Sequence, residues 1–320
     1  MHHTTMFPSV HFAGLFIGPD LSRPSSPLEL QSGCVVCSGH PLKVCPYCCS
    51  DYSFMDDILG SSSDQTFEED EEYEDDESDE DNDDSDNSEI RTFELRLPPQ
   101  DLRIGRGRVM FQKFNQPRSP DTPSSLFPPS RTIFTRFDRF VRRNKPTELL
   151  IYTDGACLDN GHANARAGCG FVFSSAPNPA SFCTFRLENK GPTGEVYKPT
   201  SNRAELRAVI AALRYRAWDS EGFRSIVIAT DSDYVVKSAT RWVRSWLKKG
   251  WKTYIGAPVK NKDLWQVLLG EAERWSERGV KIQFWWIPRY LNTEADLRAR
   301  NGANQQEVPD GFTEISGMLW

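Results

Sequence analysis

The sequence lacks any apolar run close to the ~20 residues that a membrane-spanning helix needs, so a protein anchored by such helices is excluded. Its first thirty residues contain one Arg and no Lys, which is typical of neither a secretory signal nor an Arg-rich transit peptide. Eight cysteines in 320 residues are too few for a disulfide scaffold. We therefore expect an intracellular protein, nuclear or cytoplasmic rather than mitochondrial, with no membrane partner.

Basic side chains are scarce at the front of the chain and abundant behind it. Residues 1–89 hold 2 basic and 22 acidic side chains, residues 90–146 hold 13 and 4, and residues 147–320 hold 23 and 19. The net charge of −7 at pH 7 is thus an average over an acidic front and a basic rear. The negative total therefore does not exclude a nucleic-acid partner.

Apolar residues are also scarce between residues 56 and 89, where 19 positions are Asp or Glu. Like charges at that density repel each other, and little apolar surface is available to offset the chain entropy. Residues 50–89 are therefore predicted to be disordered, as are residues 1–33, which Pro and Ser interrupt. The acidic run has two open interpretations, a solvated spacer or a segment that contacts basic proteins or the chain's own basic face. Residues 90–146 are predicted to form a basic linker rich in Pro and Arg, with a short helix or a basic arm near residues 131–145.

Five of the eight cysteines lie close together in residues 34–49. One Cys-x-x-Cys pair is followed after seven residues by a second, a spacing that can close a tetrahedral zinc site within a short segment. Free thiols in a disordered tail and a redox pair remain alternatives. The predicted ligands of this structural zinc knuckle are Cys34, Cys37, Cys45 and Cys48.

Regular patterns of strands and helices begin near residue 147 and continue to about residue 305. Short apolar strands come first, as in ELLIYTDGA and GCGFVFSS, and strands then alternate with helices whose apolar residues recur every three or four positions. This order predicts an α/β fold, a mixed sheet with helices on both faces. All nine Trp occur from Trp218 onward, so residues 147–305 are the predicted folded domain and residues 306–320 a C-terminal tail.

Four carboxylates stand where predicted elements of this domain begin or end. Asp154 and Asp231 each follow an apolar strand and a Thr, so two neighbouring strands are predicted to end in acids at one edge of the sheet. Glu205 and Asp296 are predicted in the first turns of two helices. Structural alternatives exist for all four acids. Asn202 and Glu205 match a capping box, Asp296 complements a helix dipole, and the other two acids can begin turns.

Acids from four separate elements that converge on one sheet edge need a cation to offset their desolvation and repulsion. A site made only of carboxylate oxygens suits Mg²⁺ or Mn²⁺ rather than zinc. Two such ions ~3.5–4 Å apart clamp the attacking and leaving oxygens of a phosphoryl displacement, which needs no nucleophilic side chain. Asn292, shortly before Asp296, shares with it the alternative of a structural role at the start of the last helix.

Six motifs follow one another in this half of the chain: YTDGACLDN, TSNRAELRAVIAAL, IATDSDYVV, SWLKKGWKT, PVKNKDLW and NTEADLRA. In these motifs residues 147–303 resemble the catalytic domain of ribonuclease H type 1. The resemblance implies a five-stranded mixed sheet, endonucleolytic hydrolysis of the RNA strand of RNA/DNA hybrids, and two Mg²⁺ ions for which Mn²⁺ can substitute. We expect the chain to act as a monomer.

Carried over position by position, the resemblance assigns roles to the four acids. Asp154 is expected to bridge both ions, and Asp296 to help hold the ion that activates the attacking water. Glu205 and Asp231 are expected to help hold the ion at the leaving 3′ oxygen. The resemblance further implies contacts with the hybrid for Cys157, Asn160, Ser201, Asn202 and Arg203. A small buried cysteine is the alternative for the first of these.

Residues 241–262 interleave Trp with Lys and Arg. Basic side chains suit phosphates, and aromatic faces suit the sugars and bases of a DNA strand. In this respect the stretch resembles the family's basic protrusion. A core stripe at helical spacing is the alternative for the two Trp. The predicted contacts are Trp242, Trp246, Lys248, Lys249, Lys252 and Lys260.

The chain departs from the family pattern just before Asp296. The family's loop there is longer and carries a His that assists the water step or product release, whereas here three residues separate Pro288 from Asn292 and none is His. Arg289, within this loop, is a candidate for part of that role. Two alternatives to an enzyme stay open: a non-catalytic binder of hybrids or RNA that kept the fold, and a regulatory scaffold that acts through the cysteine and acidic segments.

Overall fold

The computed structural model describes residues 102–117, 121–133, 137–175 and 181–317, together with four two-residue strands near the N-terminus. These short strands form two antiparallel pairs. They are β1 (Leu28–Glu29) with β2 (Val35–Val36), and β3 (Val44–Cys45) with β4 (Ser50–Asp51). Within the described residues, no helix is long and apolar enough to cross a membrane.

The predicted zinc knuckle and the acidic run lie largely outside the described residues. Cys45 lies in β3, whereas Cys34, Cys37 and Cys48 lie outside the described residues. The acidic stretch from residue 56 to residue 89 lies outside them as well. Zinc binding and disorder in these segments therefore stay predictions.

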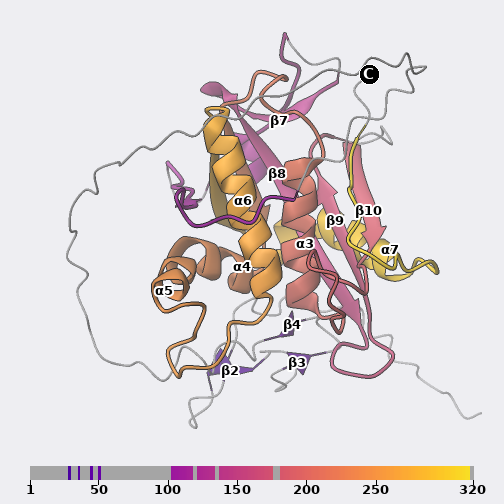
Figure 1. The fold of residues 1–320 in the computed structure, drawn as a ribbon. Helices are drawn as coiled ribbons and strands as arrows, with labels where there is room; N and C mark the ends of the chain where they lie inside the picture. The colour runs from indigo at the N-terminus through magenta and orange to yellow at the C-terminus, as the bar shows by residue number, and fades with distance from the viewer. Residues whose placement is uncertain are drawn as a thin grey trace, which may run out of the picture.

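A mixed sheet of eight strands forms the centre of the described domain (Figure 1). Its main path is β10-β9-β8-β11-β12-β5, and β7 pairs with both β8 and β6 beside that path. Neighbours from β8 through β11 and β12 to β5 are parallel, and the remaining pairs are antiparallel. The strands are β5 (Gln112–Lys113), β6 (Pro129–Ser130), β7 (Arg139–Arg142), β8 (Lys145–Leu158), β9 (Arg166–Val172), β10 (Phe182–Arg186), β11 (Ser225–Thr230) and β12 (Lys281–Trp286).

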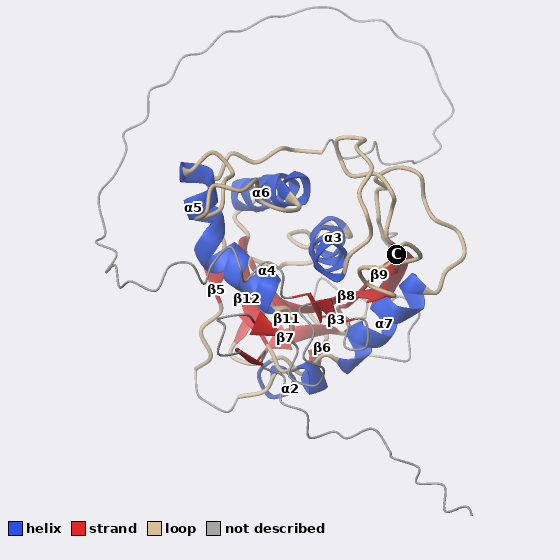
Figure 2. Ribbon diagram, turned by 90° about the horizontal axis from the view of Figure 1, so that it is seen from below, coloured by secondary structure: helices blue, strands red, loops and turns tan. Residues whose placement is uncertain are grey.

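Helices cover both faces of this sheet, as predicted. Figure 2 shows α3, α4, α5 and α6 on one side of the strands and α2 and α7 on the other. A π-helical segment, η3, joins α4 to α5, and a 3-10 turn, η4, precedes α7. The bounds are α2 (Pro123–Leu126), α3 (Ser201–Arg214), α4 (Asp233–Lys237), η3 (Ser238–Trp242), α5 (Val243–Lys248), α6 (Lys262–Glu277), η4 (Arg289–Leu291) and α7 (Thr293–Ala303).

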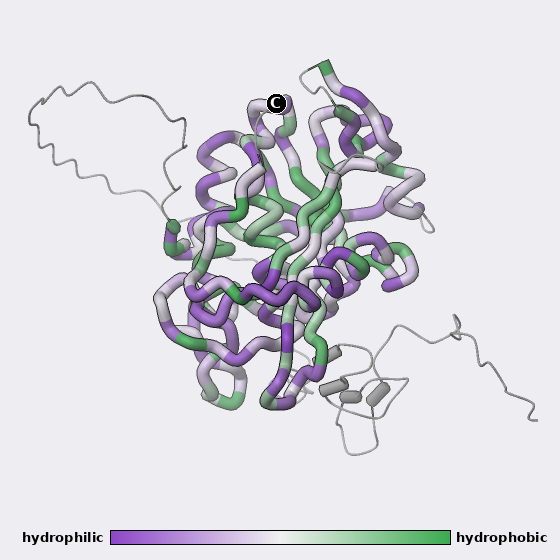
Figure 3. The backbone as a smooth tube through the Cα atoms, turned by 90° about the vertical axis from the view of Figure 1, so that its right-hand side faces the viewer, coloured by the Kyte–Doolittle hydropathy of each residue, from purple (hydrophilic) through white to green (hydrophobic). Residues whose placement is uncertain are grey.

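The central strands are buried on both faces, so their side chains divide between two apolar layers. Successive residues of a strand point to opposite sides. Leu149 and Ile151 of β8 accordingly join the cluster beneath α3 and α6, whereas Leu150 joins Trp285 in the cluster on the other face. Figure 3 shows the hydrophobic segments gathered in these strands at the centre of the domain. This two-sided core holds β8, which contains Asp154, and β11, which Asp231 follows directly.

Residues 112–142 supply three strands to the sheet, so the expected number of five is corrected to eight in the described chain. They join it because Phe111, Phe114 and Phe127 are buried against its core. β7 also replaces the helix or basic arm expected near residues 131–145. Its alternate residues Arg139 and Val141 point inward, which is a strand pattern.

The predicted C-terminal tail packs against α3 in its described part, up to residue 317. Arg207 donates a hydrogen bond to the carbonyl oxygen of Thr313 at 2.6 Å, and Arg214 forms an ion pair with Glu314 at 2.6 Å. The backbone N–H of Gly317 donates to the carbonyl oxygen of Tyr215. This segment therefore helps to hold the outer side of α3.

Candidate active site

Asp154 lies inside β8 rather than at its end, where the sequence pattern placed it. Parallel pairing with β11 stops at Tyr152, but antiparallel pairing with β9 continues to Leu158. The carboxylate therefore stands where β8 extends beyond its parallel neighbour. Because successive side chains alternate, Asp154 points to the face of the sheet opposite that of Gly155.

Two glycines allow helices to lie directly on the strands around Asp154. A side chain at Gly155 would place its Cβ 2.1 Å from the backbone nitrogen of Glu205 in α3. A side chain at Gly170, the partner of Asp154 in β9, would place its Cβ 2.4 Å from the backbone nitrogen of Ala299 in α7. Glycine at these positions thus brings the carboxylate-bearing turns of both helices close to Asp154.

Asn292 positions Asp231, which follows β11 directly. The Asn292 amide donates to Oδ1 of Asp231 at 2.6 Å and to the carbonyl oxygen of Thr153 at 3.0 Å. Asn292 is 1% exposed and makes no side-chain capping bond to α7. Asn292 is thus the N-cap residue of α7 by position, as the helix-start interpretation has it, but its side chain does not cap the helix. It ties the end of β11 to β8, a contact that no local sequence pattern signals.

Glu205 does not take part in a capping box. The N-cap of α3 is Thr200, whose hydroxyl accepts from the backbone N–H of Arg203, so Glu205 lies beyond the first turn. Its carboxylate instead accepts a hydrogen bond from the hydroxyl of Ser232, next to Asp231. Ser232, which the sequence interpretation did not single out, thus links the acid of α3 to the end of β11.

Arg289 lies between two of the acids, as the one charged residue of the shortened loop. Its guanidinium forms an ion pair with Asp296 at 2.6 Å and lies 3.9 Å from Oδ2 of Asp231. The second oxygen of Asp296 pairs with Arg300 at 2.8 Å. Asp296 is confirmed in the first turn of α7, held by two arginines.

Asp154 and Asp231 are desolvated and lie within reach of the charges of neighbouring acids. Burial raises the pKa of Asp154 well above its usual range, the charges of Asp231, Asp296 and Glu205 raise it further, and Arg289 opposes them. Burial likewise raises the pKa of Asp231, against the effects of Arg289 and Asn292. The four predicted acids are therefore brought together, and their negative charge is only partly offset by protein groups.

The donor chemistry of this cluster fits a hard divalent cation, since every donor is a carboxylate oxygen. The side chains are not yet arranged around one. Among the described residues, no three His, Cys, Asp or Glu side chains are placed to hold an ion. Arg289 engages Asp296, and Ser232 engages Glu205. Both oxygens of Asp296 are thus engaged by arginines in this structure.

Several of the predicted hybrid contacts lie together at the start of α3, but they are buried. The Asn160 amide donates to the hydroxyl of Ser201 at 3.2 Å, and both residues are almost fully covered. Cys157 is 0% exposed and its thiol lies 3.7 Å from the carbonyl oxygen of Pro199, which favours the buried-cysteine alternative.

Arg203 and Asn202 differ in what they contact. Arg203 forms a bidentate ion pair with Asp263, with a shortest distance of 2.6 Å, and its guanidinium lies 3.8 Å from the ring centre of Tyr197. This pair joins α3 to α6. Asn202 instead lines a pocket of about 490 Å³ with Lys260, between the start of α3 and the loop before α6. Two of the predicted contacts thus share one open pocket.

The predicted basic protrusion comprises η3, α5 and the loop that follows. Trp242 and Trp246 are half-buried, and the ring of Trp246 packs against that of Trp265 with centres 5.8 Å apart. A packing role, the alternative drawn from sequence, is therefore present for these two residues. The basic side chains on the same elements are exposed, namely Lys248, Lys249, Lys252 and Lys260.

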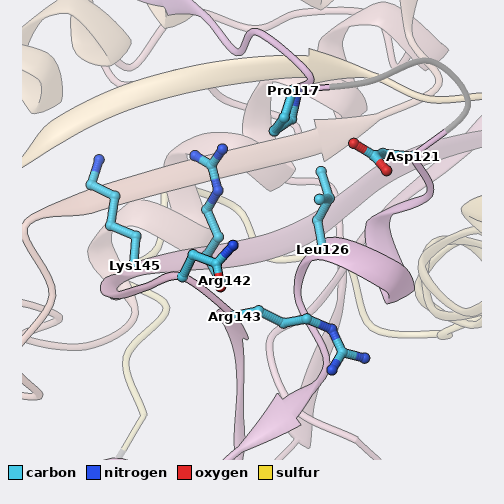
Figure 4. A pocket seen from close by; sticks show the side chains of 7 residues that line it. Pro117, Asp121, Leu126, Arg142, Arg143 and Lys145 are labelled. Carbon is cyan, nitrogen blue, oxygen red and sulfur yellow. The ribbon is translucent and has the colours of Figure 1, made fainter.

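A separate pocket of about 530 Å³ lies at the turn between β7 and β8 (Figure 4). Arg142, Arg143 and Lys145 line it, which makes it look suited to an anion. Arg142 and Lys145, however, both form ion pairs with Glu148. None of the predicted site residues lines this pocket, so the acids and the protrusion remain the candidate site.

The described domain is similar in sequence to known proteins. The family model for RNase H matches residues 146–304. The ribonuclease H of Treponema pallidum subsp. pallidum is 37% identical over 151 residues, which cover 45% of this chain and 81% of that protein. The chain belongs to the ribonuclease H family. This membership confirms the resemblance stated from the sequence motifs and the expected enzyme class.

Other relatives of the ribonuclease H family match the same region. Ribonuclease H1 of Homo sapiens is 33% identical over 184 residues, which cover 56% of each chain. Among solved structures, LC9-RNase H1, described as a type 1 RNase H with the type 2 active-site motif, is 29% identical with a TM-score of 0.37. That match covers 52% of this chain and 77% of the other.

Proposed function

We propose that this chain hydrolyses the RNA strand of RNA/DNA hybrids and that Asp154, Glu205, Asp231 and Asp296 are its catalytic carboxylates. The observation that carries the proposal is the convergence of four acids from β8, α3, the end of β11 and α7, where burial and the charges of the other three acids raise the pKa of Asp154. A carboxyl whose pKa is shifted by burial together with specific charged neighbours is typical of functional sites. The relatives named ribonuclease H support the reaction class.

The four acids would hold two divalent cations, Mg²⁺ or in its place Mn²⁺. Asp154 would bridge the pair, Asp296 would serve the side of the attacking water, and Glu205 and Asp231 the side of the leaving 3′ oxygen. Bound there, the cations would supply an activated water and stabilise the charge that develops on the leaving oxygen.

The chain's own groups prepare this arrangement. Asn292 holds one oxygen of Asp231 and leaves the other directed toward Arg289, while Ser232 orients Glu205. Arg289 balances part of the negative charge before cations bind and then has to turn away from Asp296. Its side chain is 40% exposed, so it has room to move into solvent.

Recognition of the hybrid would use the pocket that Asn202 and Lys260 line, together with the exposed lysines of the protrusion. A polar side chain can both donate to and accept from a 2′-hydroxyl, the group that distinguishes RNA from DNA. The lysines would contact phosphates of the DNA strand.

The test is cleavage of a labelled RNA/DNA hybrid by the full chain in Mg²⁺, with duplex RNA and duplex DNA as further substrates. We expect cleavage of the hybrid's RNA alone, with 5′-phosphate and 3′-hydroxyl ends, and its loss in Asp231→Asn. Asp233→Asn is the matched control, because this nearby carboxylate forms an ion pair with Lys237 and is not one of the four acids. Hybrid binding without any cleavage by the unmodified chain would contradict the proposal and favour a non-catalytic binder.

A further inference from the structure

Residues 102–108, which are neither helix nor strand, cross the outer side of α6 (Figure 1). The crossing depends on two glycines. A Cβ on Gly105 would lie 2.2 Å from the backbone nitrogen of Gly270, and a Cβ on Gly270 would lie 2.0 Å from the carbonyl oxygen of Arg103. Glycine inside a helix costs ~1 kcal/mol relative to Ala, so its presence in the middle of α6 is explained by this contact.

Glu273 of α6 fixes the backbone of the same segment. One oxygen of its buried carboxylate accepts the backbone N–H groups of Arg106, Gly107 and Arg108 at 2.8–3.1 Å. Arg103 adds ion pairs with Glu273 at 3.5 Å and with Glu277 at 2.5 Å. The segment thus lies over the buried Glu273, and it places Arg103 beside the exposed Glu277.

The side chains of Arg106 and Arg108 project from this fixed backbone. Both residues are exposed, and neither guanidinium forms an ion pair or hydrogen bond with any other described residue. Between them, Gly107 has a φ of +80°, and a Cβ there would lie 2.4 Å from Cδ1 of Leu247 in α5. The two arginines therefore lie beside the helix that carries Lys248, with Lys249 directly after it.

We propose that Arg106 and Arg108 extend the basic surface of α5 and bind backbone phosphates of an RNA/DNA hybrid outside the stretch held at the active site. This inference rests on the proposed function, since it takes the hybrid as the ligand. Exposed guanidinium groups that have no acidic partner and are held on a rigid backbone suit phosphate contacts, whose number sets the salt dependence of binding. The surface then spans two parts of the chain, α5 and the segment before β5.

The experiment measures dissociation constants for hybrids of about one helical turn, ~10 base pairs, and of about three turns over a range of salt concentrations. The full chain carries Asp231→Asn to prevent cleavage. We expect Arg106→Ala with Arg108→Ala to weaken binding of the long hybrid and to lower its log–log salt slope by ~2, about one per lost phosphate contact. Binding of the short hybrid should not change.

Two further variants control for charge and for place. Arg106→Lys with Arg108→Lys keeps both charges and should keep most of the salt slope. Arg131→Ala with Arg224→Ala removes two exposed arginines elsewhere on the chain. Arg224 directly precedes β11 and therefore lies at the opposite end of that strand from Asp231. This second pair should leave the slope unchanged.

An unchanged slope on the long hybrid would overturn the inference, as would an equal loss on the short one. Tighter binding by the double alanine variant would also overturn it. That result would indicate that the two arginines bind the chain's own acidic run instead of the hybrid. Cleavage of the short hybrid by the chain with Asp231 intact tests the proposed function separately, so the two can fail independently.

Discussion

The four carboxylates and the basic surface beside α5 are both clusters of like charge, but they are built in opposite ways. The acids come from four elements, Asp154 and Asp231 among them are desolvated, and they have protein partners such as Asn292 and Arg289. The cations on α5 and on residues 106–108 stand in solvent. Charges interact strongly when buried and weakly when water and salt screen them. The acids should therefore act as a unit, and the cations as independent contributors.

The largest expected effect concerns the segment that carries part of the basic surface. Removing residues 1–146 deletes Arg106 and Arg108 but also Phe111, Phe114 and Phe127 from the core. At ~1.5–3 kcal/mol for each buried Phe, the loss is at least about 5 kcal/mol, comparable with the stability of a whole domain. We expect this truncation to abolish cooperative thermal unfolding and cleavage together. A chain that starts at residue 102 is the control and should keep both, whereas a folded, active chain of residues 147–320 would refute the prediction.

Asp154→Asn should separate activity from stability. Because burial and neighbouring acids raise the pKa of Asp154, ionisation of this carboxyl destabilises the metal-free fold, so an amide that cannot ionise should raise the melting temperature by a few degrees. Cleavage should fall about a thousandfold or more, since several kcal/mol of transition-state stabilisation depend on the metal ligands. Asp159→Asn, at an exposed loop position, should change neither quantity. A less stable Asp154→Asn protein would contradict this account of the site.

Asn292→Ala and Asn160→Ala test two buried amides with different partners. Asn292 orients Asp231, so its loss should lower the cleavage rate about 10–100-fold with little change in hybrid affinity. Asn160 bonds Ser201 at the start of α3, so its loss should weaken hybrid binding more than it lowers the rate. Steady-state kinetics would separate the two. Equal effects of both variants on kcat would show that neither position is specific to the acids.

Arg289→Ala should make the cluster respond more strongly to Mg²⁺. The guanidinium competes with a cation for Asp296 through a partly exposed ion pair, which is worth ~0.5–1 kcal/mol. Mg²⁺ should raise the melting temperature, and the Mg²⁺ concentration that gives half of this rise should be about 2–5-fold lower in the variant. Arg298→Ala is the control, because Arg298 lies on the same helix as Asp296 but forms its ion pair with Glu294. A weaker Mg²⁺ response in the Arg289 variant would mean that this residue assists cation binding.

Lys248→Ala and Lys249→Ala should show the smallest effects. Each should raise KM for the hybrid a few-fold at low salt and reduce the salt slope of binding by ~1, with kcat unchanged. The double variant should show the sum of the two effects, because exposed charges are screened from each other. Strong non-additivity would remove the distinction drawn between the two clusters.

Sequence patterns predicted some parts of the molecule better than others. Apolar runs and helical spacing identified the central strands, α3, α6 and α7, because burial on a sheet or a helix face imposes its period on the chain. The segment before β8 was misjudged as a linker, since its strands are two to four residues long and its aromatic residues are spread among Pro and Arg. Short strands carry too few residues to show a period.

The residues that hold the acids in place were less predictable than the acids. Asp154, Glu205, Asp231 and Asp296 are recognisable by residue type, position and order. The contacts of Asn292 with Thr153 and of Ser232 with Glu205 join residues far apart in the chain, and their local patterns favour helix capping. Tertiary contacts also decided the contrast between Arg203, which forms an ion pair with Asp263, and Asn202, which lines a pocket.

Sequence alone therefore indicated the family through its motifs, predicted the fold class through its periodicity and singled out four candidate acids, since motifs and periodicity are local properties of the chain. The tertiary structure decided which side chains share a neighbourhood. It placed Arg289 among the acids, drew residues 112–142 into the sheet and laid Arg106 and Arg108 beside α5. Such juxtapositions arise from packing between distant segments, where close contacts such as those at Gly155 and Gly270 set the approach.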